Sequence, residues 1–444
     1  MKSEVECVLG DIAELVRGVS YKPEALLDGS VADAVALLRA TNIGVRCLEL
    51  KDVLYVPSKL VKAEQYLRKF DVVIAMSSGS RTAVGRLAQL RSNWVGTFGA
   101  FCGVIRPHHD RVDPEFLGYV LYSPDFRARI DTYAAGTAIM NLSREHLMGF
   151  SLSLPSRAEQ RSIAELLGRL DDRIDLLRQI NTTLESIAQA LFKSWFIDFD
   201  PVRAKAEGRE PEGMDAATAA LCPAEFEEST LGLIPKGWRV GTLAALCESI
   251  FSGGTPATRK PEYWMGELRW FASGETRNSI VIDTEKRISP EAVANSSTRL
   301  ARPGDILIAS AGQGLTRGQT SYCAIETYIN QSVVSVRTSV TAGHPAWTFY
   351  NLSRRYEEMR GLSDSHSIRG SLTTKLLAEM PIICPPLELM KCFGEVAGKM
   401  LEAQANNQRR LATLANLRDG LLPRLISGQL RLPEAQEQLE DALA

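Results

Sequence analysis

The chain lacks the sequence signatures of several enzyme and membrane classes. It contains no G-x-x-x-x-G-K-[ST] phosphate loop, and therefore no recognisable ATPase motif. The Asn-Pro-Pro-aromatic and Asp-Pro-Pro-aromatic motifs of amino-methyltransferases are absent, and no apolar run approaches the roughly 20 residues of a membrane span. No H-x-x-x-H pair or glycine-flanked carboxylate pair indicates a metal-dependent hydrolase. These absences predict a non-catalytic chain that holds no metal or cofactor.

The cysteines and histidines form no recognisable ligand set. There is no C-x-x-C pair and no adjacent histidine to complete a zinc site, so we interpret all eight cysteines as reduced thiols. His108 and His109 beside Asp110 are better explained by a turn after a strand than by a metal site. The segment FSGG (251–254) is only faintly similar to a methyl-donor loop. Acidic residues near the N-terminus, where a signal peptide needs an apolar core, lead us to expect a cytoplasmic protein.

The chain has no net positive charge, but its positive charge is concentrated in particular segments. The net charge of −2 counts against a protein that simply coats DNA, although it does not exclude DNA binding by one face. Between residues 72 and 105 the only charged residues are Arg81, Arg86 and Arg91, and between 306 and 325 Arg317 stands alone. Both segments are therefore candidates for contact with an anionic partner.

The strongest feature that is present is a long internal repeat. KFDVVIAMSSGSRTAVGR (69–86) returns as RPGDILIASAGQGLTRGQ (302–319), and GTAIMNLSREHLMGFSLSLP (136–155) returns as HSIRGSLTTKLLAEMPIICP (366–385). The offset stays near about 230 residues, far from the roughly 20–50 residues of a solenoid repeat. It predicts tandem duplication of one domain plus one helix, with pseudo-two-fold symmetry. Duplex DNA, with its half-sites, is the natural target of such a chain.

Each copy combines short alternating strands with a long helical stripe, which predicts the α+β class. Apolar residues at heptad spacing predict two coiled-coil helices that pack antiparallel, with Asn181 as a polar residue that fixes register. The alternative is that each helix packs within its own domain. The expected segments are α+β domains at 1–155 and 234–385, spacer helices at 156–200 and 386–430, a linker with one short helix at 201–233, and a charged tail at 431–444. The expected packing residues are Ile163, Leu167, Leu170, Ile174, Leu177, Leu184, Leu191, Phe393, Met400, Leu411, Leu414 and Leu421.

Polar loops rich in Ser, Gly and Arg occupy corresponding positions in both copies, while their sequences diverge. Arginine pairs with guanine, amides pair with adenine, and hydroxyls bind several partners, so these loops are the expected DNA contacts. Solvated turns remain the alternative for any single residue. The candidate contacts are Lys22, Arg39, Asn42, Ser77, Ser78, Ser80, Arg81, Thr82, Arg86, Ser252, Thr255, Thr258, Arg259, Lys260, Arg277, Asn278, Ser310, Gln313, Thr316, Arg317, Gln319, His366 and Arg369.

Several segments closely resemble the specificity subunits of type I restriction-modification systems. They are ALFKSWFIDFDPVRAK (190–205), LGLIPKGWRVGTL (231–243), SGGTPATRKPEYWMGELRW (252–270), LPSRAEQRSIAELLGRLDDRI (154–174) and LRDGLLPRLISGQL (417–430). The resemblance follows the family order of recognition domain, spacer helix, second recognition domain and second spacer helix. One departure is GVSYKP (18–23) in the first copy, where the second has the commoner GGTP turn.

The resemblance implies a non-catalytic subunit whose two target recognition domains read a split, asymmetric DNA site. Its partners would be double-stranded DNA, two modification (methyltransferase) subunits and restriction (endonuclease and translocase) subunits, with no membrane. The assembly would be an adenine-N6 DNA methyltransferase and an ATP-dependent endonuclease. S-adenosylmethionine, ATP and magnesium are expected on the partner subunits. The alternatives are a methyltransferase or nuclease with an unrecognised site, and a coiled-coil adaptor without sequence-specific DNA recognition.

Overall fold

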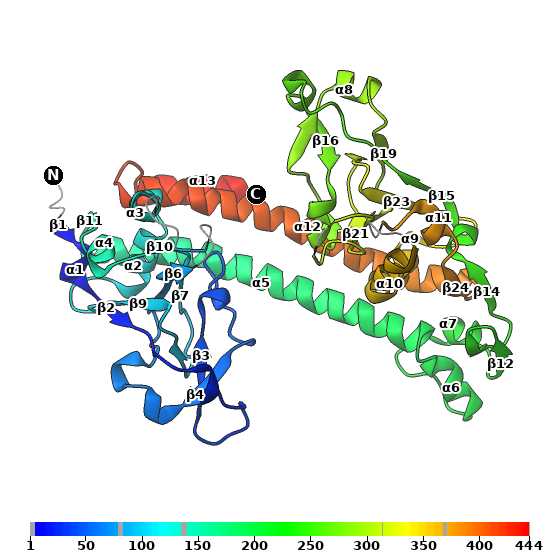
Figure 1. Ribbon diagram of the computed structural model, residues 1–444, viewed down its shortest axis with the longest axis horizontal. Coiled ribbons are helices and arrows are strands. Elements are labelled where there is room, and N and C mark those ends of the chain that lie inside the picture. The colour runs from blue at the N-terminus through cyan, green and yellow to red at the C-terminus, as the bar shows by residue number, and fades with distance from the viewer. Residues whose placement is uncertain (1–4, 79–82, 135–139, 313, 367–370, 444) are drawn as a thin grey trace. The chain divides into compact units, whose positions relative to one another are not determined.

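The chain divides into two compact units, drawn in the computed structural model of Figure 1. Unit 1 comprises Met1–Ile174 and Thr413–Ala444, and unit 2 comprises Asp175–Ala412. Both limits fall inside long helices, so each unit includes part of each helix. The residues that the structure describes are 5–78, 83–134, 140–312, 314–366 and 371–443.

The two long helices are α5 (Arg157–Phe196) and α12 (Leu387–Ile426). A capping box starts α5, because Ser156 Oγ accepts from the Glu159 amide at 3.4 Å while the Glu159 carboxylate accepts from Ser156 N at 3.3 Å. At its far end Phe199 adopts left-handed backbone (φ 56°), and Pro201 then lies in the first turn of α6 (Asp200–Ala206).

The central sheet of unit 1 is antiparallel, with the order β2–β9–β5–β7. Its strands are β2 (Ala13–Arg17), β9 (Cys102–Pro107), β5 (Val72–Ala75) and β7 (Leu87–Gln89). A second sheet has the order β4–β3–β8, and two ribbons pair β1 with β11 and β6 with β10. The other bounds are β1 (Val5–Val8), β3 (Ala34–Leu38), β4 (Leu54–Pro57), β6 (Ser77–Ser78), β8 (Thr97–Phe98), β10 (Met140–Asn141), β11 (Ser151–Leu154), α1 (Leu9–Ile12), α2 (Pro114–Leu121), α3 (Pro124–Ala134), α4 (Arg144–Met148) and α13 (Leu432–Leu443).

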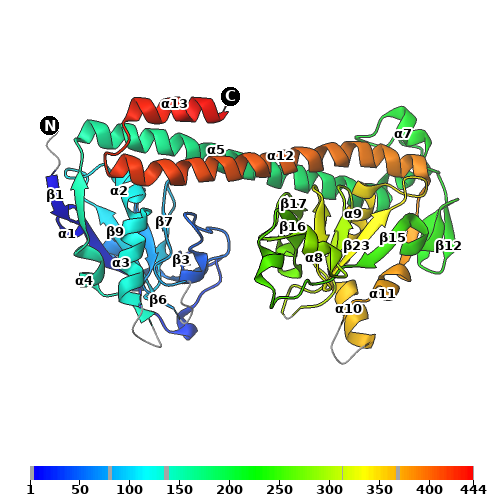
Figure 2. The ribbon, with the colours of Figure 1, turned by 90° about the horizontal axis from the view of Figure 1, so that it is seen from above.

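Unit 2 repeats this topology with one more strand, in the order β15–β23–β20–β21–β17. The first four strands correspond to β2, β9, β5 and β7. A second sheet has the order β18–β16–β22–β19, and α9 (Pro345–Ser353) packs on β20, β21 and β23 (Figure 2). The remaining bounds are β12 (Phe226–Ser229), β13 (Gly232–Pro235), β14 (Arg239–Thr242), β15 (Cys247–Ser252), β16 (Leu268–Phe271), β17 (Ile280–Val281), β18 (Lys286–Ile288), β19 (Arg299–Ala301), β20 (Ile306–Ala309), β21 (Thr320–Cys323), β22 (Thr327–Ile329), β23 (Val333–Thr338), β24 (Pro381–Cys384), α7 (Ala216–Ala220), α8 (Pro290–Ala294), α10 (Tyr356–His366) and α11 (Thr374–Ala378).

A buried ion pair is repeated in the two central sheets. In unit 1 the Arg106 guanidinium donates to Asp71 at 2.7 and 2.9 Å, and both side chains are at most 5% exposed. In unit 2 Arg337 donates to Asp305 at 2.7 and 2.9 Å. Buried charges must be paired and hydrogen-bonded, and a bidentate contact of this kind pairs both charges with two hydrogen bonds. The same arginine–aspartate contact therefore occurs at equivalent strands of both sheets, with Arg337 more exposed, at 17%, than Arg106.

The predicted fold class is confirmed: tandem α+β domains are accompanied by two long antiparallel helices. In unit 2 Asn181 of α5 contacts Asn407 of α12, whereas Glu185, one turn later, contacts Gln404, one turn earlier. The alternative reading of the helices also describes part of the structure. Phe192 of α5 lies in the main apolar core of unit 2, so the helix is a core element as well as a coiled-coil partner.

Two expected segment types differ from the structure. The segment 201–233, expected to be a linker with one short helix, forms α6, α7 and β12, and its residues Val202 and Cys222 are 0% and 3% exposed. The segment expected as a charged tail contains α13, in which Ala435 is 0% exposed. Both segments contain buried apolar residues, and their largely polar composition gave no indication of this packing. Within the described part of the chain, no helix has the length and apolarity that crossing a membrane requires.

Candidate nucleic-acid interface

In unit 1 the predicted reading loops meet at one end of the central sheet. The register pairs Arg17 with Gly103 and Ala75 with Cys102, so the end of β2, the end of β5 and the start of β9 lie together. The loop after β3 joins them, because Gly99 N donates to Leu38 O at 2.9 Å. Three loops that are remote in sequence thus form one surface.

The same end of the unit 2 sheet gathers the corresponding loops. Ser252 pairs with Val334 and Ala309 with Val333, which places the loops after β15 and β20 side by side. The segment after α10 reaches this end as well, since Leu372 N donates to Ser310 O at 2.8 Å. A polar, loop-built surface therefore occurs in both units at the same place in the topology.

Close backbone approach explains one glycine in each copy. A Cβ on Gly18 would lie 2.1 Å from Gly99 O, and one on Gly253 would lie 1.9 Å from Ile329 O. Both glycines follow the equivalent strands β2 and β15. The different turn sequences, GVSYKP and GGTP, therefore share the same steric requirement.

The candidate DNA contacts fall into four groups by exposure. Eight are exposed: Lys22, Arg86, Ser252, Thr258, Arg259, Lys260, Arg277 and Asn278. Six are half-buried: Arg39, Ser77, Thr255, Thr316, Arg317 and Gln319. Asn42 and Ser310 are buried. Ser80, Arg81, Thr82, Gln313 and Arg369 lie outside the described residues, as do the side chains of Ser78 and His366.

Asn42 organises its loop instead of facing a ligand. Its amide donates to the Asp52 and Glu49 carbonyls at 2.6 and 3.2 Å, and its oxygen accepts from Arg39 N at 2.8 Å. With the side chain 3% exposed, these contacts use the groups that base recognition would need. We therefore revise the prediction for this residue to a structural one.

The 310–319 loop is supported by helix α10. Tyr356 donates its hydroxyl to Leu315 O at 2.8 Å, and Arg360 donates to Gly314 O at 2.9 Å. Arg317 forms an ion pair with Asp364 of the same helix. The loop is thus held by side chains from α10, which favours a defined contact surface over a free turn.

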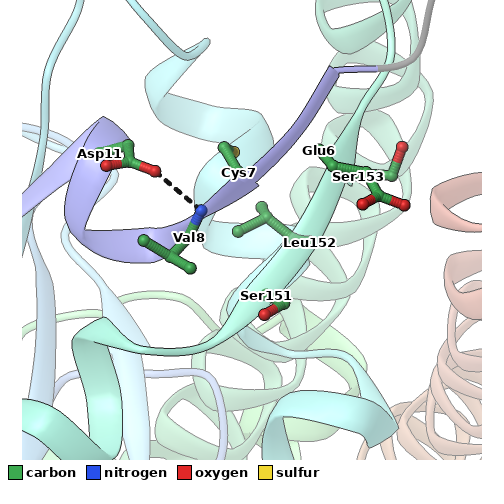
Figure 3. Close-up of a pocket in the computed structure, with 7 residues that line it drawn as sticks. All are labelled: Glu6, Cys7, Val8, Asp11, Ser151, Leu152 and Ser153. Carbon is green, nitrogen blue, oxygen red and sulfur yellow. Dashed lines mark hydrogen bonds between the residues drawn. The ribbon is translucent and has the colours of Figure 1, made fainter.

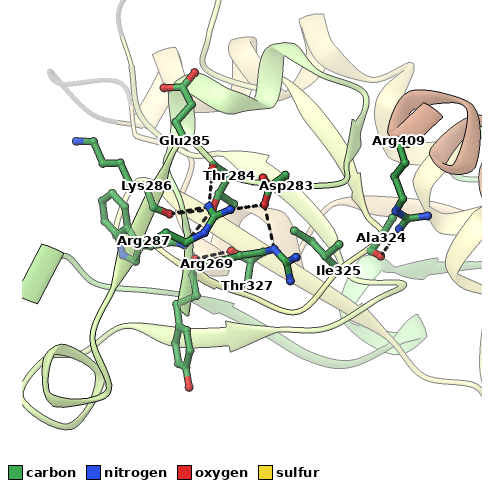
Figure 4. A network of polar contacts seen from close by, with 12 residues as sticks. Arg269, Asp283, Thr284, Glu285, Lys286, Arg287, Ala324, Ile325, Thr327 and Arg409 are labelled. Carbon is green, nitrogen blue, oxygen red and sulfur yellow. Dashed lines mark hydrogen bonds and ion pairs between the residues drawn. The ribbon is translucent and has the colours of Figure 1, made fainter. Parts of the chain in front are cut away.

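A cluster of cationic side chains on β16 and β18 of unit 2 was not predicted from the sequence. Arg269 and Arg287, on neighbouring strands β16 and β18, share Asp283 at 3.0 and 2.7 Å (Figure 4). Lys286 lies over the Trp264 and Trp270 rings at 5.4 and 5.9 Å. Burial raises the pKa of Asp283, but hydrogen bonds from the two arginines outweigh it and lower the pKa overall. Only the pairing of β16 with β18 brings these residues together.

A hollow in unit 1 is lined by acidic side chains instead of cationic ones. It is lined by Glu6, Cys7, Asp11 and residues of β11 (Figure 3). Burial and the Asp11 charge both raise the pKa of Cys7, so this thiol stays protonated. With acidic residues and a protonated thiol, the hollow does not suit an anionic ligand. Among the residues that the structure describes, no group of three His, Cys, Asp or Glu side chains could hold a metal ion.

The comparisons with known proteins agree with the sequence resemblance. Residues 8–186 match the family described as the type I restriction modification DNA specificity domain. The HindI specificity subunit of Haemophilus influenzae is 28% identical over 372 residues, covering 74% of this chain and 80% of that protein. The StySPI specificity subunit of Salmonella potsdam is 36% identical over 184 residues, 40% of each chain.

One solved structure supports the fold. The S subunit of a type I restriction-modification system from M. genitalium aligns with a TM-score of 0.60 at 14% identity, over 96% of each chain. At that identity the likeness concerns the fold alone. Together with the sequence matches, it confirms the resemblance inferred from the sequence segments.

Proposed function

We propose, for a chain whose sequence and fold are those of a type I restriction-modification specificity subunit, that each unit reads one half of a split, asymmetric DNA site. The carrying observation is the repeated loop surface: the same end of equivalent sheets presents polar loops that differ in sequence. Equivalent surfaces with different side chains suit two half-sites with different bases. The adaptor alternative is not favoured, because the relatives are specificity subunits by name.

Catalysis would belong to partner subunits in this proposal. We propose that the chain binds two modification subunits and, in a complete system, restriction subunits. S-adenosylmethionine, ATP and magnesium would be bound by those partners. The reaction would take place in the cytoplasm, where the DNA substrate is.

The helices would set the distance between the half-sites. A 40-residue helix is about 60 Å long at 1.5 Å per residue. Insertion of one heptad into α5 after Leu177 and one into α12 after Leu411 keeps the apolar stripes in phase and lengthens the helices by about 10 Å. The preferred spacer should then grow by roughly three base pairs at about 3.4 Å each.

The decisive experiment measures methylation of a randomised DNA library by the chain together with its modification subunits. A bipartite consensus with two fixed half-sites and a fixed spacer is the expected result. The isolated chain mixed with labelled S-adenosylmethionine and the same DNA should transfer no methyl group. Methylation without a consensus, or transfer by the isolated chain, would contradict the proposal.

A further inference from the structure

Arg86 and Gln319 occupy the same backbone position in the two reading surfaces. Each is the residue before the strand, β7 or β21, that follows the reading loop. The Arg86 carbonyl accepts from Ala75 N at 2.9 Å, and the Gln319 carbonyl accepts from Ala309 N at 3.0 Å. The preceding residues are Gly85 and Gly318, with φ of 75° and 87°. The two turns therefore have the same geometry, and they carry different side chains at equivalent positions.

The backbone hydrogen bonds of the two turns match further. Arg86 N donates to the Ala83 carbonyl at 3.2 Å, and Gln319 N donates to the Thr316 carbonyl at 3.0 Å. The glycine amides bond to Ala75 O and Ala309 O, both at 2.9 Å. Arg86 is exposed and Gln319 half-buried. At this position the backbone hydrogen bonds are the same in both copies and the side chain differs, as expected of a position that selects different bases.

A buried hydroxyl holds the Gln319 amide. Thr276, 3% exposed, has its Oγ1 2.7 Å from Ser273 O and 3.2 Å from Gln319 Oε1. The hydroxyl has one proton, which goes to the nearer Ser273 carbonyl. Gln319 therefore makes the better contact when a half-turn of its amide presents the NH₂ group to Thr276. The amide oxygen and the second N–H then remain for an external partner.

The surroundings of Gln319 suit a base edge. It lines an open hollow of about 410 Å³ together with Arg277, Leu315 and Tyr356. Leu315 is 73% exposed, an apolar side chain beside polar groups. An amide oxygen and N–H together match the N6 donor and N7 acceptor of adenine, and a guanidinium matches the O6 and N7 acceptors of guanine.

We propose that positions 86 and 319 are paired specificity positions: Arg86 reads a guanine in the half-site of unit 1, and Gln319 reads an adenine in the half-site of unit 2. The inference rests on the proposed DNA-reading function. Thr276 is a positioning residue that orients the Gln319 amide.

The test exchanges the two side chains. Arg86→Gln should change one base pair of one half-site from G·C to A·T, and Gln319→Arg should change one base pair of the other half-site from A·T to G·C. Each preference should shift by roughly 5- to 150-fold. The measurement is methylation of the randomised library by the complex with its modification subunits. The unaltered half-site serves as an internal control for folding and assembly.

Two control variants match the charge changes at the opposite ends of the sheets. Arg111→Gln lies beyond Pro107, at the far end of β9, and Val340→Arg lies beyond Thr338, at the far end of β23. Both positions are exposed. These variants should leave every position of the consensus unchanged. A consensus change in a control that equals the change in the exchange variant would overturn the assignment.

Further variants keep the result interpretable. Arg86→Ala and Gln319→Ala should relax the requirement at the same single base pairs. Thr276→Val should weaken the adenine preference without changing its identity, whereas Thr276→Ser should retain it. A wild-type complex without a consensus would refute the proposed function and the inference together. A bipartite wild-type consensus that survives all substitutions at 86 and 319 would refute the inference alone.

Discussion

Replacement of Phe192 by Ala tests whether the long helix α5 is part of the unit 2 core. The Phe192 side chain is 2% exposed, and its ring centroid lies 5.1–5.8 Å from those of Phe196, Phe393 and Trp347. Removal of a ring from such a cluster costs about 3–5 kcal/mol, from the transfer of the ring and the cavity left behind. A domain has only about 5–15 kcal/mol of stability, so the loss is a large fraction.

Tryptophan fluorescence during urea unfolding of the intact chain measures this loss. Five of the six tryptophans lie in unit 2, and only Trp94 lies in unit 1, so the signal reports mainly on unit 2. With a denaturant dependence of about 3 kcal/mol per M, the midpoint should fall by about 1–1.7 M.

Ile187→Ala is the matched control on the same helix. Ile187 is 42% exposed, so its truncation should cost about 0.5 kcal/mol or less. Equal midpoints for Phe192→Ala and Ile187→Ala would refute the reasoning, because α5 would then be dispensable for the core of unit 2. Circular dichroism of the native variants checks that the helix itself still forms.

Three further predictions concern polar groups. Arg106→Ala leaves the buried Asp71 charge unpaired and should cost about 3–5 kcal/mol, measured as loss of hydrogen-exchange protection in unit 1; unchanged protection would contradict it. Asn181→Leu should cost about 1 kcal/mol, and the added Asn407→Leu should recover it, because the second change removes the stranded amide; additive losses in a double-mutant cycle would count against this. Burial lowers the pKa of His344 below 6.5 despite Glu395, so the unfolded chain takes up the proton first as pH falls. The contribution of neutral His344 to the free energy of unfolding should therefore be fully present above about pH 6.5 and decrease below it. His344→Asn should remove this pH dependence in denaturation curves.

The repeat and the heptad pattern were sufficient to predict the architecture. The repeat is visible by comparing the two halves of the sequence, and the heptad pattern depends on local spacing, which the buried Leu167 and Leu170 follow. The role of Phe192 could not be read in this way, because the partners Trp347 and Phe393 are far away in sequence. The segment 201–233 was misjudged for a related reason. Its few apolar residues can be recognised as packing residues only when the core that they cover is known.

The candidate site was predicted as a set of loops but not residue by residue. Loop composition and the repeat selected the candidate segments, and the strand register places the loops after β2 and β5, and those after β15 and β20, at one end of their sheets. Composition could not distinguish Asn42, whose amide makes three hydrogen bonds to backbone groups of its own loop, from Gln319, whose amide contacts the Thr276 hydroxyl. The Arg269–Asp283–Arg287 cluster was missed because only the pairing of strands assembles it.

The discontinuity of unit 1 has a consequence for biosynthesis. Its first segment ends at Ile174 and its last begins at Thr413, so unit 2 is translated in between. Arg418 and Asp419 then reach Asp171 and Arg46 through ion pairs. At a translation rate of about 5–20 residues per second, roughly 12–50 s pass between synthesis of the apolar stripe of the first segment and synthesis of the segment that it packs against. Throughout that interval a growing chain exposes a surface that chaperones can bind and that a second nascent copy can capture.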